Sequence, residues 1–336
     1  MLKHTISSVA SIGSLFVLAV ILLGLSQPVQ ADPLYSKNLA PLEGLFGFPS
    51  LRNAQVLGRG QFSSAVHSSI SNNYSVDVRG DESVNFDGET LRFALRGAIG
   101  LGAGWELEAE VPWMKHHGGE LDKTIEDWHD FWNLPDGNRD DVPRDLIDFS
   151  YQGPGASFAM RRDVDGWGDL NLALVKEVWS DEGATISARA GIKLGTGDED
   201  ELIGSGSEDY YLAFNFSGNH ASDVPIVWHG QLGYLRAGDA DLLGDIQEQD
   251  LWFASLGMEW RTWDKVHLKV QIDSNAAVAD SATTQLGDDS VQITAGLGWL
   301  FAAGWEAEFS FSEDIAVDTA PDFVVQFGVR YRAPRS

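Results

Sequence analysis

Three histidines lie in stretches where polar and apolar residues alternate, and their imidazole rings could act as general bases. His67 stands in the serine-rich stretch 64–69, and a serine beside a histidine is the pair that many hydrolases use for nucleophilic attack. His229 and His267 lie in other alternating stretches. No nucleophile elbow or other recognisable motif accompanies them. We therefore predict no catalytic residue and interpret these histidines as polar filling of an interior.

Carboxylates and imidazoles also gather in a long polar stretch, where they could ligate a divalent metal. Asp122, Glu126 and His129 fall on one face at helical spacing, and His116 and His117 lie close by in the sequence. Such side chains are common in acidic loops that hold no metal. We predict no metal site, and no motif of the chain indicates a cofactor.

The stretch 136–147 begins like an EF-hand calcium loop, with Asp, Asn and Asp at alternate positions. The match fails further on, because Asp141 replaces the required glycine and Ile147 replaces the bidentate glutamate. Weak Ca²⁺ binding by this stretch or by the acidic run 198–201 is the alternative.

A larger set of charged side chains recurs at every second position of the alternating stretches. A two-residue period places them on one face of each strand, opposite the apolar residues. In a closed barrel that face lines the lumen, either as the charged wall of a channel or as a closed network of ion pairs. The predicted lumen-lining residues are Arg92, Arg96, Glu106, Glu108, Glu110, Arg189, Lys193, His267, Lys269, Glu306 and Glu308.

Strands must position these side chains, because the hydrophobic period is two residues from about residue 61 to the end. In 105–113, for example, Trp, Leu, Ala, Val and Trp alternate with three glutamates. One face of such a strand suits lipid and the other needs water. About twelve strands are predicted, near 61–70, 91–101, 105–113, 169–179, 186–194, 209–216, 226–236, 251–260, 266–273, 291–299, 305–311 and 323–331.

The connections between the predicted strands alternate in length, as they do in bacterial outer-membrane barrels with short periplasmic turns and long outer loops. The shorter connections are 102–104, 180–184, 217–224, 262–264 and 300–304. The longer ones are 71–89, 114–167, 196–208, 237–249, 274–288 and 313–321.

Tryptophan is frequent, with 12 residues in the chain, and several tryptophans flank the shorter connections. Aromatic rings with a polar N–H favour the boundary between membrane and water. The tryptophans beside these connections are Trp105, Trp179, Trp260, Trp263, Trp299 and Trp305, which indicates an interfacial girdle.

Composition excludes several other classes of protein. The formal net charge is −27, which argues against nucleic acid as a partner because phosphate binding needs clustered Lys and Arg. The 336-residue chain has no cysteine, so disulfides and thiol chemistry are excluded.

The amino terminus resembles an export signal. Lys3 precedes an apolar run that is densest over 15–25, and 29–31 has small residues at its first and third positions. We predict a signal peptide at 1–31, cleaved after Ala31, and export from the cytoplasm. An uncleaved anchor is the alternative.

The mature chain resembles a family of proteobacterial proteins, domain-of-unknown-function family 3187. The resemblance rests on Gly47–Gln55, Asp87–Phe93, Ile125–Trp132 and Pro135–Asp140. It implies an outer-membrane barrel without an assigned activity. The stretch 193–198 is also similar to a strand end of an outer-membrane family linked with phenol meta-cleavage pathways, which usually has proline where this chain has a glycine. Many such barrels end in an aromatic residue, whereas here Tyr331 precedes five further residues.

The connection 114–167 is far longer than the usual loop, and such loops tend to be functional or disordered. Its residues Leu121, Ile125, Trp128 and Trp132 have helical spacing. We predict a partly helical outer loop that gates the barrel mouth; a surface helix that covers the rim is the alternative.

The sequence therefore predicts an all-β, antiparallel transmembrane barrel of the bacterial outer membrane. Its divisions are the signal peptide 1–31, a lead-in or plug at 32–60, the barrel at 61–332 and a tail at 333–336. A narrow or gated channel for small solutes is the favoured function. A closed structural or surface-binding barrel is the alternative, and an envelope lipid-modifying enzyme is less favoured. Expected partners are outer-membrane lipid, the barrel assembly machinery and small solutes.

Overall fold

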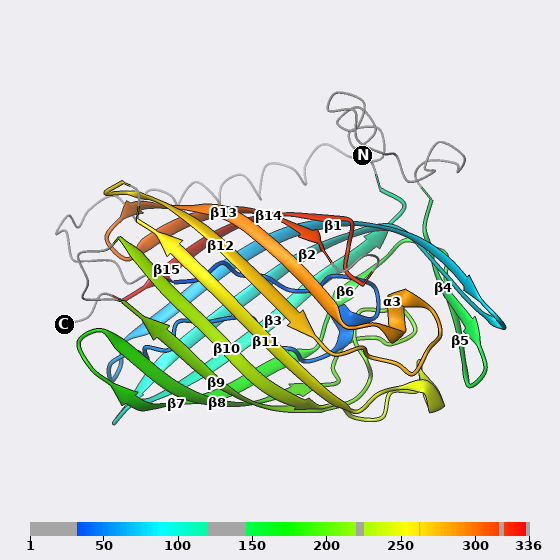
Figure 1. The fold of residues 1–336 in the computed structure, drawn as a ribbon, viewed down its shortest axis with the longest axis horizontal. Coiled ribbons are helices and arrows are strands. Elements are labelled where there is room, and N and C mark those ends of the chain that lie inside the picture. Colours follow the sequence, from blue (N-terminus) through cyan, green and yellow to red (C-terminus); the bar gives the residue numbers. More distant parts are fainter. Residues whose placement is uncertain (1–31, 120–145, 220–224, 262, 316–318, 334–336) are drawn as a thin grey trace, which may run out of the picture.

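The computed structural model describes residues 32–119, 146–219, 225–261, 263–315 and 319–333. These residues form a closed antiparallel barrel of twelve strands, each hydrogen-bonded to the next along the chain and the last to the first (Figure 1). The predicted fold class is confirmed. The barrel strands are β1 (Phe62–Arg79), β2 (Glu82–Gly102), β3 (Trp105–His117), β7 (Leu170–Ser180), β8 (Ala184–Leu194), β9 (Asp209–Gly218), β10 (Ile226–Arg236), β11 (Asp250–Trp260), β12 (Val266–Asn275), β13 (Ser290–Ala302), β14 (Trp305–Asp314) and β15 (Phe323–Arg332).

The alternation of the sequence separates two surfaces of the barrel wall. On β9, Leu212 and Phe214 are 66% and 64% exposed, whereas their neighbours Tyr211 and Ala213 are buried. An apolar outward face suits lipid, and the inward face carries the polar and charged residues. Exposed tryptophans beside the short connections include Trp105, Trp179, Trp260, Trp263 and Trp299, and a second set of exposed aromatic residues lies toward the other end of the strands, at Trp167, Tyr210, Tyr234 and Trp252.

The predicted loop 71–89 is wrong, because β1 and β2 continue through it as one long hairpin. Their register runs without a break from Ser63↔Ala98 to Arg79↔Glu82. The polar run 71–73 hides the strand in the sequence, because Asn72 takes an outward position between apolar residues. The outward face returns to apolar residues at Val76 and Val78, which are 59% and 68% exposed.

The predicted loop 114–167 is also partly strand. β3 extends to His117, and the later part forms β4 (Asp148–Gly153), β5 (Ala156–Met160) and β6 (Val164–Trp167). β4 pairs with the outer part of β2 and with β5, and β6 pairs with the end of β3. The predicted gate residues Leu121, Ile125, Trp128 and Trp132 lie outside the described residues, as do the candidate ligands Asp122, Glu126 and His129 and the stretch 136–140.

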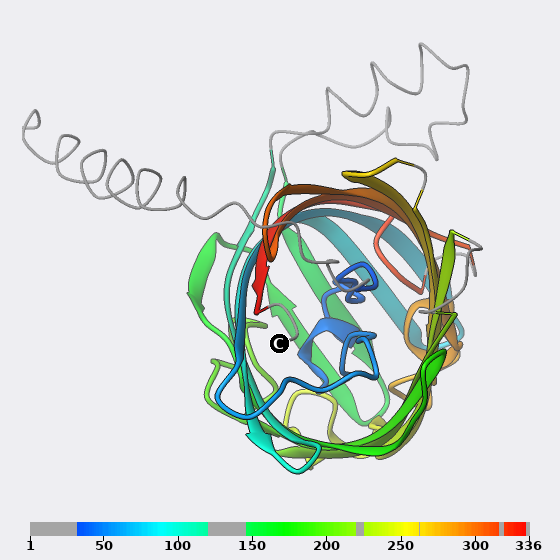
Figure 2. The ribbon, with the colours of Figure 1, turned by 90° about the vertical axis from the view of Figure 1, so that its left-hand side faces the viewer.

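Residues 32–60 are called the lumen segment, because residues 32–57 run inside the barrel (Figure 2) and only its last three residues are exposed. Asp32 lies beside Arg332, near the end of the barrel that carries the short connections. The chain then reaches the opposite, outer end, where Asn38 donates to the Ser290 hydroxyl. After a single turn of 3-10 helix, η1 (Glu43–Leu45), it returns to bond with β2 at Gly100 and enters β1.

An apolar layer closes the outer end of the lumen. Its centre is the tip of the lumen segment, where Leu42, Leu45 and Phe46 are buried. Outer connections containing η3 (Gly244–Ile246) and α3 (Thr284–Gly287) pack around this tip. None of the helices among the described residues has the length and apolarity to span a membrane. The other members of the layer include Val84, Phe86, Phe149, Tyr151, Leu202, Ile203, Leu235, Leu243, Leu251, Phe253, Val278 and Leu286.

Candidate functional site

Below the apolar layer, toward the short connections, the lumen is filled by charged side chains. Glu110 of β3 faces two arginines of β2: its carboxylate accepts from Arg92 at 2.8 Å and from Arg96 at 3.1 Å. Arg96 and Glu110 are direct partners in the β2–β3 register, so adjacent strands bring the opposite charges together. The Tyr35 hydroxyl of the lumen segment adds a hydrogen bond of 2.9 Å to Glu110.

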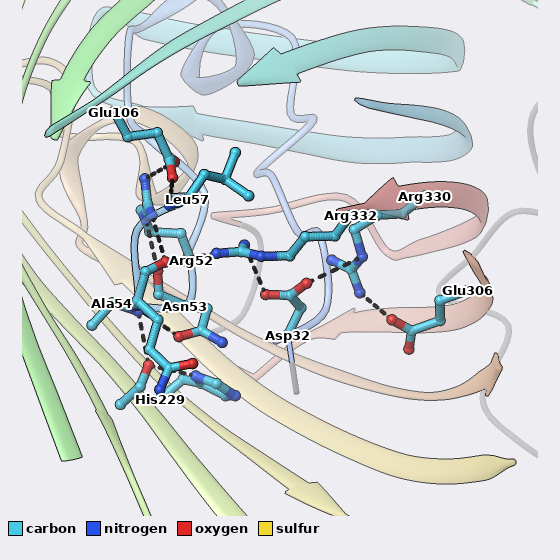
Figure 3. Close-up of polar contacts among 12 residues, drawn as sticks. Asp32, Arg52, Asn53, Ala54, Leu57, Glu106, His229, Glu306, Arg330 and Arg332 are labelled. Atoms are coloured by element: carbon cyan, nitrogen blue, oxygen red, sulfur yellow. Dashed lines mark hydrogen bonds and ion pairs between the residues drawn. The ribbon is translucent and has the colours of Figure 1, made fainter. Parts of the chain in front are cut away.

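Arg52 ties the returning arm of the lumen segment to β3. Its Nη1 lies 2.9 Å from Glu106 and 2.6 Å from Glu108, and its other nitrogens donate to the carbonyls of Asn53 and Gln55. The guanidinium thus holds both the wall and the backbone of its own loop (Figure 3). The carboxylate of Glu108 is shared with Arg189 of β8 at 2.7 Å. Multiple charge-assisted bonds of this kind are stronger than single neutral ones.

A second network lies on β12, β14 and β15. Lys269 and Arg330 bind Glu306, and Lys269 lies 3.3 Å from Glu308. The carboxylate of Asp32 lies 3.3 Å from Arg332 and 3.6 Å from Arg330 (Figure 3). Burial raises the pKa of the Asp32 carboxyl, but Arg332 and Arg330 outweigh burial and hold that pKa well below its ordinary value. The start of the lumen segment is therefore an anion held by two cations.

Lys193 of β8 anchors the tip of the lumen segment at the outer end. Its ammonium lies 3.2 Å from Asp169 and 3.1 Å from Asp209, and it donates to the Leu45 carbonyl at 3.0 Å. Asp209 in turn accepts the Gly47 N–H at 2.7 Å. The buried lysine thus compensates two carboxylates and positions the turn of the segment.

Glu43 lies at this tip, buried at the edge of the apolar layer. Its Oε2 atom has no hydrogen-bond partner among the described residues. Burial raises the pKa of the Glu43 carboxyl to about 8, so the group is mostly neutral at neutral pH. A neutral carboxyl is compatible with an apolar seal.

The histidines serve as contacts within the lumen. His267 lies 2.8 Å from Glu259, and His229 bonds the Ser217 hydroxyl at 2.8 Å. His67 stacks on the Tyr35 ring with 4.2 Å between ring centroids. The buried Ser217 hydroxyl also accepts the Ala54 N–H of the lumen segment, so this Ser–His pair lies beneath that segment.

A cavity of about 80 Å³ lies between the lumen segment and strands β1, β2, β3, β7 and β8. Of the predicted lumen residues, Arg96, Glu106, Glu108, Glu110 and Arg189 line it. Arg92, Lys193, His267, Lys269, Glu306 and Glu308 are inside the barrel but belong to the surrounding ion pairs. The cavity is the candidate solute site, because it is polar and has room for several water molecules at ~10–15 Å³ each.

No group of three or more metal-ligating side chains is found within the described parts of the chain. His116, considered as a ligand from the sequence, bonds the Thr90 hydroxyl at 2.8 Å and the Leu202 carbonyl at 2.9 Å. In the acidic run 198–201, Glu201 pairs with Arg162.

Sequence reasoning missed the lumen-segment members of this site, namely Asp32, Tyr35, Lys37 and Arg52. These residues lie in no strand, so no periodicity marks them. One signal was present, since Arg52 falls within the motif Gly47–Gln55 on which the family resemblance rests.

The family model described as "Protein of unknown function (DUF3187)" matches residues 11–333. The chain belongs to this family. Its description assigns no activity, and the side chains inside the barrel are the evidence for the function of the DUF3187 chain. No curated protein matches the chain.

Solved structures similar to the DUF3187 chain are outer-membrane channels. An outer membrane channel from Pseudomonas putida F1 aligns with a TM-score of 0.56 and 13% identity, covering 83% of this chain and 98% of that one. The NanC porin aligns with a TM-score of 0.49 and 8% identity, covering 80% and 100%. The first similarity shows a shared fold, and at this identity nothing beyond the fold. The fold is that of bacterial outer-membrane channels, which supports an outer-membrane location.

Proposed function

We propose that the DUF3187 chain is an outer-membrane channel for small solutes whose closed state is set by the lumen segment. The observation that carries the proposal is the path of that segment. Residues 32–60 enter and leave the barrel at the same end and are held inside by ion pairs and hydrogen bonds. Contacts of this kind can break and re-form without any change in the barrel wall.

The lumen supports a two-part path. The charged layer with its cavity lies toward the short connections, and the apolar layer blocks the outer end. Charged and hydrated walls suit the passage of polar solutes, and apolar constrictions act as gates. For a solute to pass, the tip at Leu42, Leu45 and Phe46 must leave the apolar layer. We also keep the connection 114–167 as a candidate outer gate, as the sequence predicts.

Planar-bilayer recording of the purified, heat-modifiable protein tests the proposal. We expect discrete conductance steps from the full-length chain, and more frequent openings when residues 119–146 are removed if they act as an outer gate. A folded barrel that never conducts at any voltage, with or without those residues, would contradict the channel.

A closed structural barrel is the second candidate, and the apolar layer favours it because that layer leaves the outer end without a polar path. If the barrel is structural, a deletion strain should lose envelope integrity whichever solute is supplied. For both candidate functions we propose that the signal peptide is cleaved after Ala31 and that the barrel assembly machinery inserts the barrel. The fold neighbours are channels, and we propose no enzymatic activity for the chain.

A further inference from the structure

The cavity in the charged layer has more basic than acidic side chains in its wall. The basic residues lining it are Lys37, Arg52, Arg96, Arg189, Arg330 and Arg332, and the acidic ones are Asp32, Glu106, Glu108 and Glu110. A local excess of cations is unexpected in a chain with a formal net charge of −27. Arg330 is paired with Glu306 outside the lining, so the side of the cavity that carries Lys37 and Arg96 is where an additional anion is stabilised.

The acidic side chains of the wall already have their partners. Glu106 binds Arg52 and the Leu57 N–H, and Glu108 is shared by Arg52 and Arg189. Glu110 accepts from Arg92, Arg96 and Tyr35, as described above, and Asp32 lies between two arginines. A solute cation would therefore have to displace an existing arginine, whereas a solute anion would not.

Two cations of the wall keep donors for a ligand. The Lys37 ammonium has three N–H groups and, among the described residues, donates to one protein acceptor, the Phe48 carbonyl at 2.5 Å. Arg96 pairs with Glu110 through Nε, and its guanidinium lies 4.8 Å from the centroid of the Tyr35 ring. Its side chain is 20% exposed, the largest fraction among the arginines of these ion pairs inside the lumen.

The surroundings of Lys37 also favour an additional anion. Burial lowers the pKa of the Lys37 ammonium to about 8; Glu110 acts against this, and Arg92, Arg189 and Arg96 lower it further. Three arginines thus act on Lys37 against one carboxylate, that of Glu110. A bound anion would relieve the repulsion between Lys37 and the arginines.

We propose that this cavity binds a small organic carboxylate, which Lys37 and Arg96 hold by its oxygens. A guanidinium and an ammonium are the donors that recognise carboxylates. Leu51 and Tyr211 also line the cavity and offer contact to a short apolar group. The volume of about 80 Å³ admits a few non-hydrogen atoms, so the ligand is small. The inference deepens the proposed function by naming the class of solute.

Isothermal titration of the purified full-length protein tests the site without requiring conductance. Propionate is the probe, and propylammonium of similar size is the matched cation. We expect propionate to bind at pH 6.5 and propylammonium not to bind. Lys37→Met and Arg96→Gln should each weaken propionate binding about tenfold or more, since each removes a charge-assisted hydrogen bond.

Lys176→Met is the matched control, because Lys176 also donates to a backbone carbonyl, that of Ala103, but lies outside the cavity lining. Its propionate affinity should equal that of the unsubstituted protein. Binding should also weaken as pH rises through about 8, where Lys37 loses its proton, and Lys37→Met should remove this dependence. Heat-modifiable migration of each variant establishes that the barrel has folded.

Three results would overturn the carboxylate site: propionate that does not bind, propylammonium that binds as well, or inorganic phosphate that binds as tightly as propionate. The last would show a general oxyanion site. Failure of this inference is distinguishable from failure of the channel. If the protein conducts but does not bind propionate, the carboxylate site is contradicted and the channel is supported. If it binds propionate but never conducts, the channel is contradicted and the carboxylate site is supported.

Discussion

Removal of residues 34–56 is expected to convert a mostly closed barrel into an open one. The deletion takes away the tip that fills the apolar layer and the arm that holds Arg52 against β3. The barrel wall is continuous without the segment, because β1 pairs with both β15 and β2. If the closed state of the full chain is favoured even ~99:1, its loss raises mean conductance ~100-fold. Planar-bilayer recording and liposome swelling measure the change.

Deletion of residues 119–146 is the matched control, since it removes a segment of similar length and leaves the lumen segment in place. If that deletion raises conductance more than the deletion of 34–56 does, the main gate is the outer loop. Unchanged conductance after deletion of 34–56, in a barrel that remains heat-modifiable, would show that the lumen segment does not obstruct the path.

Replacement of Arg52 by alanine is expected to loosen the lumen segment and raise the frequency of opening. Arg52 is 6% exposed, and its loss leaves Glu106 and Glu108 with fewer cations in a buried site. Breaking a buried ion pair on one side costs about 3–5 kcal/mol. A cost of that size, placed on the docked state, multiplies the ratio of open to closed protein ~10²–10⁴-fold. Single-channel recording gives the open fraction directly.

Arg79→Ala is the control for loss of an arginine, because Arg79 is 56% exposed at the tip of the β1–β2 hairpin and its ion pair in the described part of the chain is with the neighbouring Asp77. The open fraction of the Arg79→Ala protein should match that of the unsubstituted protein. Adding Glu106→Gln to Arg52→Ala should produce less than the sum of the two single effects, since both act on one interaction. Strict additivity would mean that Arg52 does not restrain the segment through Glu106.

The barrel was predictable because lipid imposes a strict rule on the sequence. A strand with water on one side and lipid on the other must alternate, and β3 does so from Trp105 onward. Strand prediction failed where the sequence does not alternate in this way. In the outer part of the β1–β2 hairpin the polar run 71–73 interrupts the alternation, although Val76 and Val78 resume the apolar outward face beyond it.

The candidate site was predictable only as far as the barrel wall. Arg96 and Glu110 were expected side by side because neighbouring strands must pair, and register joins them. The partners supplied by residues 32–60 were not predictable, because that segment follows no period. Its hydrogen bonds reach strands β2, β3, β8, β9, β10, β13, β14 and β15. Its glycines and prolines, such as Gly47 and Pro49, are compatible with a lead-in and with a lumen segment alike.

A reversible crosslink tests the central claim most directly. Ser36 of the lumen segment and Thr294 of β13 have their hydroxyl oxygens 3.1 Å apart, and the chain contains no cysteine, so Ser36→Cys with Thr294→Cys offers a single disulfide. The pair should be placed in the Arg52→Ala protein, in which openings are frequent. We predict that the protein shows no channel openings in planar bilayers under oxidising conditions and that openings return when reductant is added. Equal conductance in the oxidised and reduced protein, with the crosslink verified by mass spectrometry, would show that solutes pass without movement of the lumen segment.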